Sequence, residues 1–87
     1  MRLYVTNIDD FIKVTTVSYP VTIKIEDITW YGMPCIRVQG VSKQDLSMLV
    51  ICEIYVHENF VKEEVEKIKR KLEDIGYTVV EGEYIGR

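Results

Sequence analysis

Alanine is absent from this 87-residue sequence, although 41 of its residues are apolar. The apolar residues are instead bulky, and twelve Val, eleven Ile and six Tyr make up most of them. A chain of this length predicts a single domain over residues 1–87, which is too short for a Rossmann or TIM-barrel enzyme. The apolar content is also too high for a disordered protein.

Long hydrophobic runs are missing as well. The longest uninterrupted apolar run, residues 48–52, has five residues, whereas a membrane-spanning helix needs about 18. No basic segment followed by an apolar stretch opens the chain, as it would in a secretory signal. We therefore expect a cytoplasmic protein without a membrane partner. Glu and Lys are common while Asn and Gln occur twice each, a usage typical of hyperthermophile proteins.

Cysteine and histidine are too few for the common metal sites. Cys35 and Cys52 show no CxxC spacing, and His57 is the only histidine, whereas a tetrahedral zinc site takes four ligands. We expect two reduced thiols, no metal and no cofactor. Cys52 lies in an apolar strand and should be buried; Cys35, near a turn and two residues from Arg37, is the better candidate for an exposed thiol. His57 is expected to bond a helix cap or water at a strand end.

Catalytic and nucleotide-binding motifs are also absent. The sequence contains no P-loop, no dinucleotide-binding glycine motif, no HExxH and no GxSxG, so no enzyme class is indicated. The net charge is −3, and no basic patch stands out, although phosphate contacts supply most of the affinity for nucleic acids.

The pattern of apolar residues predicts an α+β fold. Residues 21–26 alternate, with Val21, Ile23 and Ile25 pointing inward, and Gly32 suits a hairpin turn at residues 30–34. An antiparallel meander of about five strands is predicted over residues 3–8, 11–19, 21–26, 36–39 and 48–57.

One amphipathic helix is predicted over about residues 60–75. Its apolar stripe repeats at steps of four and three residues, and its members are Val61, Val65, Ile68, Leu72 and Ile75. Asn59 suits the N-cap, and Gly76 suits the position after the C-cap. A final strand over about residues 77–85 should rejoin the sheet by a βαβ crossover. A half-open barrel with the helix across its mouth is the alternative.

One helix cannot cover both faces of such a sheet, so we expect an apolar sheet face that binds a partner. The uncovered face is expected to include some of the residues Tyr4, Ile12, Val14, Leu49, Ile51, Tyr55 and Tyr84. The candidate interface residues are Trp30, Tyr31, Leu49, Ile51, Tyr55, Phe60 and Tyr84. The predicted function is a non-enzymatic domain that self-associates, as a symmetric dimer, or joins a larger protein complex.

Nucleic-acid binding by the sheet is the alternative. Tyr and Trp side chains would stack on bases, and Lys13, Lys24 and Arg37 would contact phosphates. The mixed charge of the sequence favours the first hypothesis.

Overall fold

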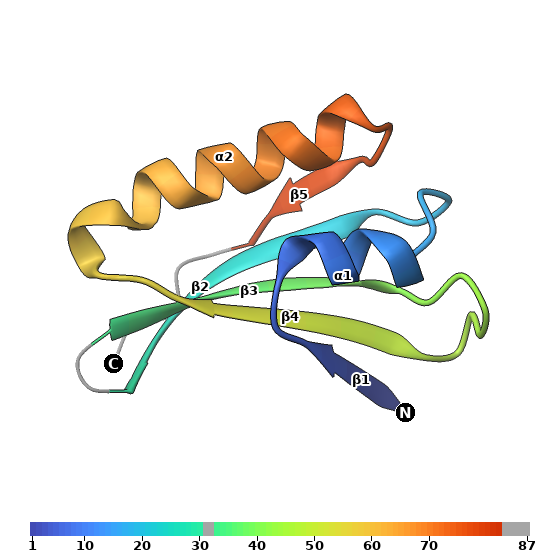
Figure 1. The fold of residues 1–87 in the computed structure, drawn as a ribbon, viewed down its shortest axis with the longest axis horizontal. Coiled ribbons are helices and arrows are strands. Elements are labelled where there is room, and N and C mark those ends of the chain that lie inside the picture. Colours follow the sequence, from blue (N-terminus) through green and yellow to red (C-terminus); the bar gives the residue numbers. More distant parts are fainter. Residues whose placement is uncertain (31–32, 83–87) are drawn as a thin grey trace.

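Two helices and five strands make up the computed structural model, which describes residues 1–30 and 33–82, with the backbone alone for residues 27–30. In chain order the elements are β1 (Arg2–Val5), α1 (Ile8–Val14), β2 (Val21–Trp30), β3 (Met33–Val41), β4 (Leu49–Tyr55), the 3₁₀ turn η1 (Glu58–Phe60), α2 (Val61–Asp74) and β5 (Val79–Glu81). The fold is α+β, as the sequence predicts (Figure 1).

The sheet is mixed, with strand order β1-β4-β3-β2-β5. The strands β2, β3 and β4 pair antiparallel, whereas β1 is parallel to β4 and β5 is parallel to β2. The prediction of a purely antiparallel meander is therefore wrong beyond these three strands. The edge strands differ because each is joined to the rest through a helix, α1 or α2, and parallel pairing needs such a long connection.

The helix α1 was not expected, because the sequence analysis assigns residues 11–19 to a strand and counts one helix. Asn7 caps the helix: its Oδ1 accepts a hydrogen bond of 2.8 Å from the backbone N–H of Asp10. Phe11 then reaches the core and is fully buried, with Ile8 and Ile12 packed beside it. The spacing of three and four residues is helical, and it outweighs the β-branched composition that favoured a strand.

The helix α2 lies close to the predicted range. Val65, Ile68 and Leu72 of its stripe are buried, whereas Ile75, at the C-cap, is about half exposed. Gly76 follows with a φ of 103°, a conformation that favours glycine.

The start of α2 differs from the prediction. Asn59 lies within η1 rather than at the N-cap of α2. Its backbone N–H donates a 3.1 Å hydrogen bond to Nδ1 of His57. His57 is thus itself the N-cap of η1, which agrees with the helix-cap alternative of the expectation that it bonds a cap or water.

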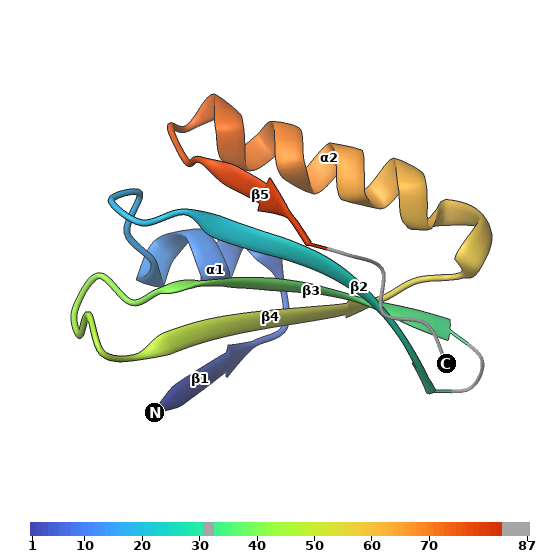
Figure 2. The same cartoon turned by 180° about the vertical axis from the view of Figure 1, so that it is seen from behind.

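The core lies between the two helices and one face of the sheet. Both helices pack on that face; α1 stands in front of the strands in Figure 1 and behind them in Figure 2. The buried strand residues of the core are Val21, Ile23, Ile36, Val38, Val50 and Cys52. They share one cluster with Phe11 of α1 and Leu72 of α2. The other face of the sheet is consequently left without a helix.

Candidate interaction surface

The sheet face opposite α1 and α2, called the open face below, carries the alternate side chains of every strand. Near one end it is apolar. Leu49 of β4 pairs with Val41 of β3, and Ile51 pairs with Gln39. On the other side, Tyr4 of β1 lies beside Ile51, and the exposed Arg2 lies beside Leu49. We call Tyr4, Val41, Leu49 and Ile51 the apolar half of the open face.

Exposure varies strongly across the apolar half. Tyr4 is 56% exposed at the edge strand, whereas Ile51 is 3% exposed at the centre of the sheet. Val41 and Leu49 are half-buried. The apolar half therefore has a packed centre and an accessible margin, and further burial of Tyr4 and Leu49 would be favourable.

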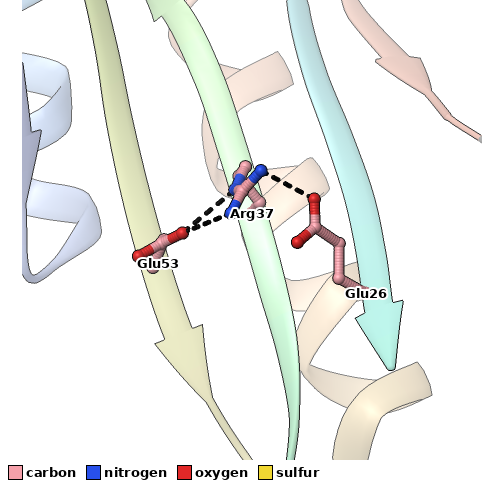
Figure 3. A network of polar contacts seen from close by, with 3 residues as sticks. All are labelled: Glu26, Arg37 and Glu53. Atoms are coloured by element: carbon pink, nitrogen blue, oxygen red, sulfur yellow. Dashed lines mark hydrogen bonds and ion pairs between the residues drawn. The ribbon is translucent and has the colours of Figure 1, made fainter. Parts of the chain in front are cut away.

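The adjoining part of the open face is occupied by an ionic cluster of Arg37, Glu26 and Glu53, centred on Arg37 (Figure 3). The guanidinium donates two hydrogen bonds to Oε2 of Glu53, from Nε at 3.0 Å and from Nη2 at 2.7 Å. Its Nη1 lies 2.7 Å from Oε1 of Glu26. Burial would lower the pKa of Arg37, but the hydrogen bond to Glu53 and the charges of both carboxylates raise it above its usual value. Arg37 therefore stays charged and joins β2, β3 and β4.

Cys35 lies beyond the cluster, where it pairs with Tyr55 of β4. The expectation of an exposed thiol is wrong, because Cys35 is only 2% exposed. Burial, followed by the charge of Glu53, raises the pKa of this thiol. The expectation for Cys52 is confirmed: it is fully buried in the core, and burial raises its pKa to about 11. Both thiols are thus held in the unreactive protonated form.

Three of the predicted interface residues share the open face, namely Leu49, Ile51 and Tyr55. Phe60 is exposed but belongs to η1 rather than to a strand. The predictions for the Trp30 side chain, Tyr31 and Tyr84 fall outside the described residues.

Two further residues assigned to the uncovered face lie elsewhere. Ile12 and Val14 belong to α1 and pack against the core. The prediction for these two residues is therefore wrong, and the cause is the same mistaken strand over residues 11–19.

The three basic residues of the nucleic-acid alternative do not form one surface. Lys24 and Arg37 are cross-strand neighbours on the open face, but Lys13 belongs to α1 on the other side of the sheet. Arg37 is also occupied by two carboxylates. Among the described residues no ion pair involves Lys24, the other basic residue of this set on the open face.

Sequence reasoning missed Val41 and the two glutamates that flank Arg37. Val41 stands at an alternate position after Arg37 and Gln39, so extending the alternation along β3 would have found it. Glu26 and Glu53 also occupy polar alternate positions, but their meeting on Arg37 depends on the register between three strands. That register follows from the folded sheet rather than from any local pattern.

Comparison with protein-family models, with curated proteins and with solved structures found no match. Neither α1 nor α2, the helices of the described residues, is long and apolar enough to cross a bilayer. Within residues 1–26 and 33–82, whose side chains the structure describes, no three His, Cys, Asp or Glu side chains gather as a metal site. The open face is accordingly the surface from which we argue function.

Proposed function

We propose that this protein is a non-catalytic interaction domain that self-associates through its open face, with the apolar half at the centre of the contact. The supporting observation is the one-sided placement of both helices, which leaves Tyr4 56% exposed and Leu49 and Val41 half-buried on the next two strands of the same face. Contiguous exposed apolar surface of this kind marks interaction sites on small proteins.

The size of the open face suits a small dimer interface. With strands ~4.8 Å apart and ~3.3 Å per residue, five strands and the seven residues of β4 span on the order of 20 × 23 Å. A standard interface buries ~800 Å² per partner, about a seventh of the 5732 Å² surface of the chain. The flat area of the open face is on the order of 460 Å², a little over half of this standard. We therefore expect the whole open face to take part and the dimer to be weak.

A second copy of the chain is compatible with the charges on this face. The open face carries Glu26 and Glu53 against Arg37 and Lys24, whose charges cancel, and Arg2 adds one positive charge at the edge strand. Like charges therefore do not oppose a two-fold axis through this face. Each apolar half would lie against the partner's sheet, and Tyr4 would lose most of its contact with water.

Sedimentation equilibrium over a range of protein concentrations tests this proposal. The wild-type mass should rise from the 10.2 kDa of the monomer towards twice that value as the concentration increases through the micromolar range. The double variant Tyr4→Ser, Leu49→Ser should remain monomeric, because it removes the accessible apolar margin.

The matched control is the double variant Val17→Ser, Tyr19→Ser. These two residues are also about half exposed, but they lie in the connection between α1 and β2 rather than on the open face. The control should associate like the wild type. A wild-type chain that stays monomeric at all concentrations would refute self-association. Nucleic-acid binding at low salt that is lost in Lys24→Ala would instead support the alternative function.

A further inference from the structure

A groove lies on the helix side of the sheet, where the start of α2 approaches β2 and β3. Its volume is about 370 Å³, within the lower part of the ~300–1,000 Å³ range of small-molecule sites. Its apolar wall is formed by Ile25, Pro34, Val61 and Val65. Its charged rim is formed by Glu58, Lys62, Glu66 and Glu81.

The rim carries an excess of one negative charge. Glu81 is neutralised by Lys69, whose Nζ lies 2.9 Å from Oε2 of Glu81. The remaining rim residues are the carboxylates of Glu58 and Glu66 and the ammonium group of Lys62. Among the described residues no ion pair joins Glu58 or Glu66 to a basic side chain. A ligand with a single positive charge would therefore balance the rim.

We propose that this groove binds a small organic monocation, an apolar body that carries one primary amine. The apolar body would lie against Ile25, Val61 and Val65, where it is shielded from water. The ammonium group would lie at the rim beside the carboxylate, Glu58 or Glu66, that Lys62 does not balance. A second copy of this chain fits the groove less well, because it would bring the same acidic rim towards this one. The proposal is independent of self-association, since the groove and the open face lie on opposite sides of the sheet.

Three matched probes test the proposal on the full chain: phenylbutylamine hydrochloride, phenylbutanol and sodium phenylbutyrate. They share the apolar body and differ in charge. The amine should shift the amide NMR signals of Ile25, Val61 and Lys62 most strongly. An exposed ion pair contributes ~0.2–1 kcal/mol, so the amine should bind up to about fivefold more tightly than the alcohol. The carboxylate should bind most weakly, and added salt should reduce the differences.

Substitution of the rim carboxylates provides a second measurement, the change in preference for the amine over the alcohol. In the variants Glu58→Gln and Glu66→Gln, the advantage of the amine over the alcohol should shrink, while the affinity for the alcohol should stay the same. Glu63→Gln is the matched control: Glu63 is an exposed carboxylate of α2 that does not line the groove. This variant should keep the preference for the amine. Because all three residues are solvent-accessible on η1 or α2, the variants should retain the fold.

Several outcomes would overturn the proposal. Equal affinities for the three probes would show that the rim does not select charge. Shifts confined to the open face, or none with any probe, would show that the groove is not a binding site.

Discussion

Arg37 and Glu26 form a diagonal ion pair across β2 and β3, with Nη1 of Arg37 2.7 Å from Oε1 of Glu26. They are not direct cross-strand neighbours, because Arg37 pairs with Lys24 and Glu26 pairs with Cys35. The carboxylate is buried, whereas the guanidinium side chain is 31% exposed. Arg37 thus balances the negative charge of the Glu26 carboxylate, which is buried away from water. The pair restricts the sheet register on the same face that we propose for self-association.

Replacement of Arg37 by Met should destabilise the protein by about 2–3 kcal/mol in urea unfolding. Breaking a fully buried ion pair costs ~3–5 kcal/mol because one charge is left without a partner; the cost here is smaller because Arg37 is partly solvated. Glu53→Gln should cost about 1 kcal/mol, since Glu53 is the more exposed carboxylate. In the double variant Glu26→Gln, Arg37→Met, part of the loss should be recovered. Equal losses for Arg37→Met and Glu53→Gln would contradict this account.

Gly40 of β3 lies directly under the ring of Phe11. A Cβ atom at this position would stand 2.8 Å from Cζ of Phe11, and this ring is fully buried in the core. Gly40→Ala should therefore lower the free energy of unfolding by about 1–3 kcal/mol. Phe11→Leu should restore part of that loss when it is combined with Gly40→Ala, because the shorter side chain makes room.

Gly82→Ala is the control for the Gly40 prediction. A Cβ atom at Gly82 would also come close to a side chain, 2.6 Å from Cγ of Lys24. The lysine side chain is flexible and can move away, so this substitution should cost well under 1 kcal/mol. A larger loss for Gly82→Ala than for Gly40→Ala would show that rigidity of the Phe11 ring does not govern the effect.

The contrast between α1 and α2 shows how far the sequence predicts this fold. The helix α2 could be predicted because its stripe repeats over several turns and Gly76 marks its end. The helix α1 has only seven residues. Over so short a segment the helical spacing of Ile8, Phe11 and Ile12 is a weaker signal than the β-branched composition, which favours a strand. The decisive signal was local: Asn7 followed three residues later by Asp10, which together form the cap.

The residues of the open face likewise include some that the sequence predicts and some that depend on the folded sheet. Leu49, Ile51 and Tyr55 stand at alternate positions of one strand, so their shared face follows from the sequence. The position of Tyr4 beside Ile51 depends on a parallel pairing between β1 and β4. That pairing exists because α1 returns the chain across the sheet, and it could not be predicted once α1 was missed.

Tyr77→Phe should lower the free energy of unfolding by about 1–2 kcal/mol, measured in urea. The hydroxyl groups of Tyr77 and Thr15 lie 2.7 Å apart, and both residues are buried. Thr15 donates its own proton to the carbonyl of Phe11 at 2.7 Å, so in this short contact Tyr77 is the donor to Thr15. The Tyr77 hydroxyl also lies 3.3 Å from the carbonyl oxygen of Thr15 and 3.5 Å from that of Ile12. Removing the hydroxyl deletes the short bond together with these longer contacts and leaves Thr15 with an unfilled acceptor. Tyr4→Phe, on an exposed ring, should change stability by less than about 0.5 kcal/mol, and a similar loss in both variants would contradict the role of this bond.

The buried thiol of Cys52 should make stability depend on pH in the alkaline range. Its pKa is about 11 in the folded protein, against an ordinary value of 9.0. The folded state therefore holds the proton more tightly, and stability that is fully present below pH 9 is lost as the pH rises to 11. Two pKa units correspond to at most about 3 kcal/mol.

Tyrosines also titrate in this pH range. A comparison of the wild type with Cys52→Ala therefore isolates the contribution of the Cys52 thiol to the pH dependence. Urea unfolding of the wild type and of Cys52→Ala at several pH values should show a steeper alkaline decline for the wild type. Cys52→Ala will be less stable at neutral pH because it leaves a cavity, but the test depends on the slopes rather than on that offset. Parallel declines would mean that Cys52 titrates alike in the folded and unfolded chains. Thiol labelling gives a second measurement: burial should make both cysteines react far more slowly in the folded protein than in urea.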